Sequence, residues 1–319
     1  MEKPFYARSA NQTGEWETVA HHLNRAGALC GDFADEFGCR EAGEILGKLH
    51  DLGKISKSFQ EVLTHRRIHV NHAVPGGAVA LNRFGDKDSG QLLALPIAGH
   101  HSELDSGVLP LLRRTLSGAG EAFDPEQNEI PLFGAEALVA AFQMVRKLAP
   151  LPPERPKLPD WKAGEDPHLA YMLAARMLFS ALVDADYSSS AEHFEPDYLE
   201  THSAPNLDAA AALASLKTLR AEKQKNAKGD PALNKIRDDL FADCLTAAQN
   251  PPGLFTLTAP TGTGKTLSLL AFAAAHAQKW GKRRIILLLP FLALAEQSVR
   301  DYRAVIPDLL ESHSAANLS

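Results

Sequence analysis

The order of elements predicted for the carboxy-terminal part of the chain most constrains its fold. A β-rich run, LFTLTAP (254–260), leads through a glycine-rich turn into a helical pattern, LSLLAFAAAHAQKW (267–280). A second apolar run, RRIILLLP (283–290), is followed by a second helical pattern, FLALAEQSVRDYRAV (291–305). Strand, turn, helix, strand and helix in this order are the opening of a parallel α/β sheet. Because two strands cannot cover their own faces, we expect a chain cut inside a larger α/β domain.

Residues 1–190 carry helical periodicity instead, with no run of alternating strands. The expected helices are 17–37, 41–54, 72–84, 90–104, 134–148 and 168–188. Residues 207–249 predict two more helices, broken at KGDP (228–231). The predicted fold class is therefore mostly α: an all-helical domain followed by a truncated parallel α/β fragment. The predicted domains are 1–200, a helical connector at 201–250, and 251–319.

The glycine-rich turn lies in APTGTGKT (259–266), between a predicted strand and a predicted helix, which is the context of a phosphate-binding loop. The nucleotide-binding candidates are Thr261, Gly262, Thr263, Gly264, Lys265 and Thr266. Glycines let backbone N–H groups surround phosphates, Lys265 reaches the outer phosphates, and Thr266 binds Mg²⁺.

Ala259 stands where the strict loop has glycine, and this form resembles superfamily 2 helicases, as does LPFLALAEQ (289–297). The resemblance implies a RecA-like fold for this fragment, with ATP and Mg²⁺ as cofactors of a full-length helicase. No apolar strand ending in Asp-Glu follows, so we expect no useful ATP hydrolysis by this chain.

Bulk composition gives fewer constraints. The net charge of −6 does not indicate nucleic-acid binding by itself. A basic run, THRRIH (64–69), could contact a DNA backbone or be a solvated loop. The three cysteines, Cys30, Cys39 and Cys244, lack metal-binding spacing and fit a reducing cytoplasm. We expect neither a signal peptide nor a membrane span.

Histidine is concentrated near the amino terminus, where eight of the 13 lie within the first 101 residues. The segment GKLHDLGKIS (47–56) sets His50 beside Asp51. Neighbours on a helix point about 100° apart, so both reach one metal only at a helix end where other elements add ligands. The other candidate ligands are His22, His72, His100, His101, Asp184 and Asp186.

Five segments occur in an order that resembles the HD superfamily of metal-dependent phosphohydrolases. They are AHHLNRA, LHDLGK, NHAV, GHHS and DADY, all within residues 20–190. In particular, the series resembles the HD nuclease domain of the type I CRISPR-associated nuclease–helicase. The resemblance implies an all-helical HD-superfamily fold for this part of the chain.

The resemblance also implies a site for two divalent transition-metal ions. The implied ligands of the first ion are His22, His50, Asp51 and Asp186, and Asp51 would bridge to a second ion at His72, His100 and His101. His21 is an alternative to His22, and Asp184 to Asp186; the family register favours His22 and Asp186. Asp51 and Lys54 are the catalytic candidates, with Lys54 facing phosphate. Imidazole-rich sites favour Mn, Fe, Co or Ni over Mg, and two such ions activate water for attack on phosphorus.

The expected function is hydrolysis of single-stranded DNA as part of a CRISPR-associated nuclease–helicase in antiviral defence. The resemblance implies single-stranded DNA and an RNA-guided surveillance complex as partners. An HD phosphohydrolase acting on small nucleotides is one alternative, and an inactive nucleotide-binding scaffold is another. A fused helicase segment argues against the first alternative, and a full set of metal ligands argues against the second.

Overall fold

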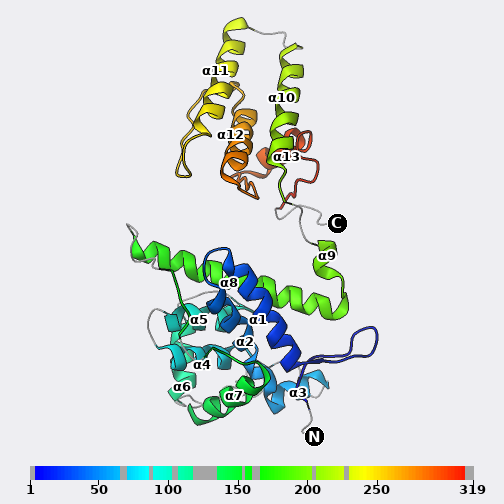
Figure 1. Cartoon of the computed structure of the whole chain (residues 1–319), viewed down its shortest axis with the longest axis vertical. Coiled ribbons are helices and arrows are strands. Elements are labelled where there is room, and N and C mark those ends of the chain that lie inside the picture. The colour runs from blue at the N-terminus through cyan, green and yellow to red at the C-terminus, as the bar shows by residue number, and fades with distance from the viewer. Residues whose placement is uncertain are drawn as a thin grey trace. The chain divides into compact units, whose positions relative to one another are not determined.

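The protein is described by a computed structural model, which is mostly helical and divides into two compact units, Met1–Ser203 and Ala204–Ser319 (Figure 1). The structure describes residues 4–64, 70–85, 89–102, 107–117, 135–152, 155–159, 166–202, 206–225 and 230–312. The high helix content confirms the prediction of a mostly α protein. The basic run at 64–69 lies, apart from Thr64, outside the described residues.

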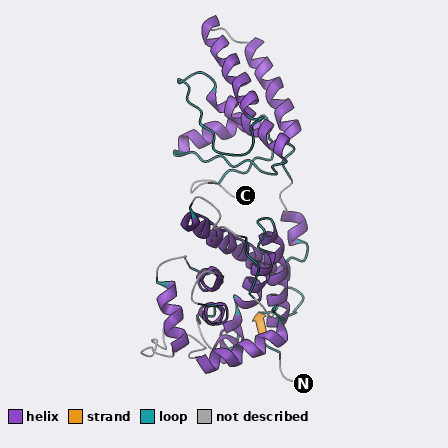
Figure 2. Cartoon of the chain, turned by 60° about the vertical axis from the view of Figure 1, so that its left-hand side comes forward, coloured by secondary structure: helices purple, strands orange, loops and turns teal. Residues whose placement is uncertain are grey.

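The first unit begins with an antiparallel hairpin of two short strands, β1 (Tyr6–Arg8) and β2 (Glu17–Thr18), in which Arg8 pairs with Glu17. Helices follow (Figure 2). They are α1 (Val19–Asp35), α2 (Arg40–Leu49), the short 3₁₀ helix η1 (Leu52–Ile55), α3 (Lys57–Leu63), α4 (Val74–Phe84), α5 (Ser89–Gly99), α6 (Val108–Ser117), α7 (Ala135–Leu148), α8 (Pro167–Phe194) and α9 (Tyr198–His202). Each helix predicted for residues 1–190 is present, with ends that differ by a few residues.

Helices α1 and α2 pack closely because small residues line their contact. A Cβ atom added to Gly47 of α2 would lie 2.4 Å from the Ala26 carbonyl oxygen on α1. A Cβ atom on Gly31 would instead meet a side chain, Glu44, whose Cγ lies 2.7 Å away. The close approach lets the start of α1 and the end of α2 share one polar cluster.

Helix α8 packs along α1 and also contacts α2 and α5, which places its middle beside that cluster. Asp166 caps its first turn by accepting hydrogen bonds from the backbone N–H groups of His168 and Leu169. Within α8, His168–Phe194 is long and apolar enough to cross a membrane by length and composition alone, a test that core helices of soluble proteins also pass.

The second unit contains α10 (Ala209–Lys225), α11 (Pro231–Ala247), α12 (Lys265–Trp280) and α13 (Leu292–Arg303). The break predicted at 228–231 is confirmed, since α10 ends before it and Asp230 caps α11. Leu216, Phe241, Leu270 and Tyr302 form a shared core, so the helices predicted as a connector pack against α12.

The segments 254–260 and 283–290 differ from the prediction, because neither forms a strand in the described structure; the strand drawn in Figure 2 lies in the first unit. Leu254, Ile286 and Leu288 are 96%, 79% and 89% exposed. A strand is stabilised by ladder hydrogen bonds and side-chain packing against neighbouring strands. The described part of this unit provides no such neighbours, so β propensity alone leaves these segments irregular.

Candidate metal centre

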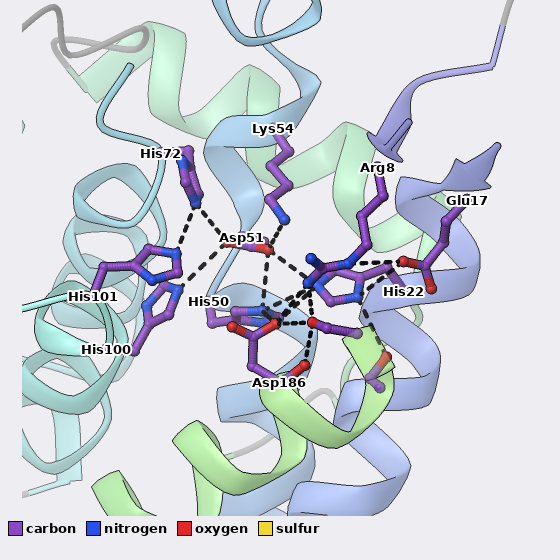
Figure 3. Close-up of polar contacts among 12 residues, drawn as sticks. Arg8, Glu17, His22, His50, Asp51, Lys54, His72, His100, His101 and Asp186 are labelled. Atoms are coloured by element: carbon purple, nitrogen blue, oxygen red, sulfur yellow. Dashed lines mark hydrogen bonds and ion pairs between the residues drawn. The ribbon is translucent and has the colours of Figure 1, made fainter. Parts of the chain in front are cut away.

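The candidate ligands converge from five places in the first unit (Figure 3). His22 lies in the first turn of α1, and His50 and Asp51 link the end of α2 to η1. His72 precedes α4, His100 and His101 follow α5, and Asp186 lies on α8. We call His22, His50, Asp51 and Asp186 the inner group, and Asp51, His72, His100 and His101 the outer group; within each, one ligand atom per residue lies within 4.8 Å of the others.

Asp51 belongs to both groups because its two carboxylate oxygens face different sides. Oδ2 lies 3.0 Å from His22 Nε2 and 3.2 Å from His50 Nε2. Oδ1 lies 3.3 Å from His72 Nε2 and 3.5 Å from His100 Nε2. Figure 3 shows the Asp51 carboxylate between the two sets of imidazoles. This geometry suits a carboxylate that bridges two cations.

The inner group is shielded from solvent, whereas the outer group opens to it. His22, His50 and Asp51 are fully buried, and the Asp186 side chain is 15% exposed. Asp186 Oδ1 lies 3.4 Å from the Nε2 atoms of both His22 and His50. In the outer group His101 is exposed, and its Nε2 lies 2.9 Å from His72 Nε2. A substrate from solvent therefore reaches the outer group first.

Backbone carbonyls fix the orientation of three of the histidine rings. His50 Nδ1 lies 2.8 Å from the Gly47 carbonyl oxygen, His72 Nδ1 3.1 Å from that of Val70, and His100 Nδ1 2.7 Å from that of Ile97. A carbonyl can only accept, so each Nδ1 carries the proton and donates it. In a neutral ring Nε2 is then a lone pair directed into the cluster, as in metal-ligating histidines.

Charges in the cluster shift several pKa values. Burial alone would lower the pKa of His50, but Asp51 and Asp186 outweigh it and raise that pKa to about 10. Burial lowers the pKa values of His72 and His101 to about 4, so both rings are neutral at pH 7. Burial opposes ionisation of Asp51, yet the charges of His50 and Lys54 hold its pKa well below the usual range. The inner group thus attracts positive charge, and the neutral rings of His72 and His101 can bind a cation.

The residues fit two divalent cations. Asp51 Oδ1 and His100 Nε2 are buried and have no hydrogen-bond partner, which is costly unless a cation compensates for their lost hydration. The Nε2 atoms of His22 and His50 lie 3.3 Å apart, and both lie near Asp51 Oδ2, so a bound cation would replace the protons that otherwise join these atoms. Five imidazoles and two carboxylates suit Mn, Fe, Co or Ni better than Mg, which prefers oxygen ligands.

Lys54 is nearly buried, and its ammonium lies 2.5 Å from Asp51 Oδ2. It also lies over the Phe59 ring, 5.5 Å from the centroid. The ammonium therefore contributes positive charge inside the cluster, next to the bridging carboxylate. That it contacts a phosphate stays a prediction.

Sequence reasoning missed the polar residues behind the inner group. Arg8 pairs with the buried Glu17 at 3.2 Å and with Asp186 Oδ1 at 3.2 Å, and also contacts Ser190. Glu17 Oε2 and Ser189 Oγ lie 3.6 and 3.3 Å from His22 Nδ1. No motif connects these positions, because hairpin pairing and the packing of α8 bring them together.

The geometry separates the alternatives that the sequence left open. His21 is exposed, with its ring 3.1 Å from Glu17, and Asp184 is exposed on α8. Neither belongs to the two groups, whereas the neighbouring His22 and Asp186 do.

We therefore expect Asp186→Ala to lower the number of transition-metal ions bound per chain, because the inner group loses one of its two carboxylates. Asp184→Ala, two residues away on the same helix, should bind as many ions as the wild type. Elemental analysis after equilibration with Mn²⁺ and desalting measures both. Equal metal content in the two variants would remove Asp186 from the ligand set.

The phosphate-loop candidates lie together in the second unit. Gly264 precedes α12, which begins at Lys265, and Lys265 Nζ donates to the carbonyls of Ala259 and Pro260 at 2.7 and 2.9 Å. Thr263 Oγ1 donates to the Pro260 carbonyl at 2.7 Å. The loop is thus a compact turn at a helix amino terminus, an arrangement that binds phosphate through backbone N–H groups.

Comparison with known proteins bears on the second unit. The family described as "Type III restriction enzyme, res subunit" (ResIII) matches residues 219–317, from within α10 to beyond α13. No curated protein matches the chain. The ResIII match supports a helicase-like, nucleotide-binding region, and it does not reach the metal centre. Together with the His/Asp groups, it indicates an enzyme of the helicase or nuclease kind that is able to hold metal ions.

Proposed function

We propose that the first unit is a metal-dependent phosphodiesterase that cuts single-stranded DNA, with an HD-superfamily fold. The observation that carries this proposal is the carboxylate of Asp51, whose oxygens face two separate sets of imidazole Nε2 atoms. Two-metal sites are a recurrent solution for hydrolysing phosphate esters. The helicase-like region favours a nucleic acid over a small nucleotide, because a motor that moves along a strand suits a polymeric substrate.

The two groups of metal ligands and Lys54 would have separate roles in the reaction. The inner group would hold one ion and the outer group the other; bound there, they would lower the pKa of water and neutralise phosphate charge. The phosphodiester would approach the outer group from the side where His101 is exposed and His72 is partly exposed. Lys54, beside Asp51, would add positive charge where the phosphate oxygens bind. Hydrolysis then adds water across one P–O bond and divides the strand.

The broader setting follows from the resemblance of the five His/Asp segments. By that resemblance, the protein acts in antiviral defence in the cytoplasm, recruited by an RNA-guided CRISPR surveillance complex. The second unit would be part of a RecA-like core that uses ATP and Mg²⁺. The support for this setting is the order of the five segments together with the ResIII match in the same chain.

Cleavage of a labelled single strand in different metals tests the proposal. We expect the purified chain to degrade single-stranded DNA with Mn²⁺, Co²⁺ or Ni²⁺, and slowly with Mg²⁺ alone, because imidazole ligands disfavour Mg²⁺. Full activity in Mg²⁺ with no response to transition metals would contradict the ligand assignment.

The same assay separates the alternatives. Duplex DNA and nucleoside triphosphates are run beside the single strand, with the metal-chelated protein as a blank. Hydrolysis of nucleoside triphosphates without DNA cleavage would assign the site to small nucleotides. A protein that binds metal but cleaves neither substrate would be a scaffold.

A further inference from the structure

Arg237, in the middle of α11, reaches the phosphate loop from a helix that precedes it in the sequence. Its Nε and Nη2 atoms lie 3.0 and 2.9 Å from the Gly262 carbonyl oxygen, so both donate to one acceptor. Its Nη1 donates to Asn234 Oδ1, one turn earlier on α11, at 3.2 Å. The guanidinium is therefore held at both ends, and it fixes one carbonyl of the loop.

The direction of that carbonyl decides where the next N–H group points. In a trans peptide the C=O and the following N–H point in opposite directions within one plane, and the described chain contains no cis peptide. Because the Gly262 carbonyl is directed at Arg237, the N–H of Thr263 is directed away from Arg237. The N–H groups of such a loop are the groups that bind phosphate oxygens.

This peptide plane needs an external restraint because one of the two torsions that orient it belongs to a glycine, Gly262. Gly262 and Gly264 have φ angles of 85° and 82°, in the left-handed region that glycine enters freely. Glycine also permits other backbone conformations at similar cost, so these residues alone do not hold one orientation. The carbonyls of Ala259 and Pro260 accept from Lys265, whereas that of Gly262 accepts from Arg237. The charged side chains of Lys265 and Arg237 therefore hold different carbonyls of the loop.

We propose that Arg237 is a positioning residue of the phosphate loop, which holds the Gly262 carbonyl outward so that the Thr263 N–H faces the phosphates of a bound nucleoside triphosphate. The proposal rests on nucleotide binding by the helicase-like region. Arg237 acts here through the loop backbone, with no contact of its own to the nucleotide.

Titration of the full chain with a fluorescent ATP analogue and Mg²⁺ tests this role. We expect Arg237→Ala to weaken binding about tenfold or more, since two charge-assisted hydrogen bonds are lost. Arg237→Lys should recover part of the affinity, because an ammonium can still donate to the carbonyl. A general loss of stability would not give this recovery.

Arg220→Ala is the matched control. Arg220, on α10, pairs with Asp238 and lies 3.9 Å from the Phe241 ring centroid, so it contacts α11 without touching the loop. The affinity of the Arg220→Ala variant for the ATP analogue should stay within about twofold of that of the wild type. Equal losses in Arg220→Ala and Arg237→Ala, or an unchanged affinity in Arg237→Ala, would overturn the positioning role alone. A wild-type chain that binds no analogue would overturn nucleotide binding itself, and the positioning role with it.

Discussion

Asp51→Asn should bind few metal ions at either group and should cleave single-stranded DNA several orders of magnitude more slowly than the wild type. The carboxylate offers one oxygen to each set of imidazoles. Asparagine keeps the shape but replaces one oxygen with an NH₂ donor and removes the negative charge. One side of the cluster then meets a donor where a cation should bind, so both the bridge and the activation of water are lost.

Metal content by elemental analysis and the cleavage rate in Mn²⁺ measure this effect, with circular dichroism to verify the helices. Asp184→Asn is the control, because it removes one carboxylate of the same unit at an exposed position. A variant at Asp51 that keeps more than about a tenth of the wild-type rate would show that this carboxylate does not bridge catalytic ions.

Gly47→Ala should destabilise the first unit by about 2 kcal/mol or more, although alanine is the better helix former. The added methyl would lie 2.4 Å from the Ala26 carbonyl oxygen and 2.5 Å from Gly27 N, which are backbone atoms of α1 and cannot turn aside. The helices must separate instead. Gly47 also supplies the carbonyl that accepts from His50 Nδ1, so the separation displaces a metal ligand.

Gly31→Ala is the matched substitution across the same helix pair. Its methyl would meet the Glu44 side chain, which can change rotamer, so we expect a stability within about 1 kcal/mol of the wild type. Urea unfolding followed by circular dichroism, together with Mn²⁺ content, compares the two variants. If Gly47→Ala is as stable as Gly31→Ala, the close approach of α1 and α2 is not needed for the fold.

The helices were largely predictable because their signals are local. The Asp-Pro step at Asp230 and Pro231 marks the start of α11, and apolar periodicity marks α1. Local signals failed at 254–260 and 283–290, where β propensity is strong but a strand depends on neighbours elsewhere. Secondary structure could therefore be predicted wherever its signals lie within the segment itself.

The metal centre was predictable in its residue types but not in its surroundings. His50 and Asp51 were identifiable because a short motif contains both. The family register favoured His22 over His21, but the physical difference between them is burial, which depends on which face of α1 meets α2 and α8. The roles of Arg8 and Glu17 could not be predicted, since they depend on strand register and on a helix far away in the sequence.

The separation in sequence between the ligands has a consequence during protein synthesis. Asp51 and its imidazole neighbours His22 and His50 are translated early, whereas Asp186 belongs to α8, the last long helix of the first unit. At about 5–20 residues per second, Asp186 follows Asp51 by roughly ten seconds. The nascent chain therefore cannot complete its inner group until the first unit is almost fully made, and a chain that ends before α8 has the outer ligands but lacks one carboxylate of the inner group.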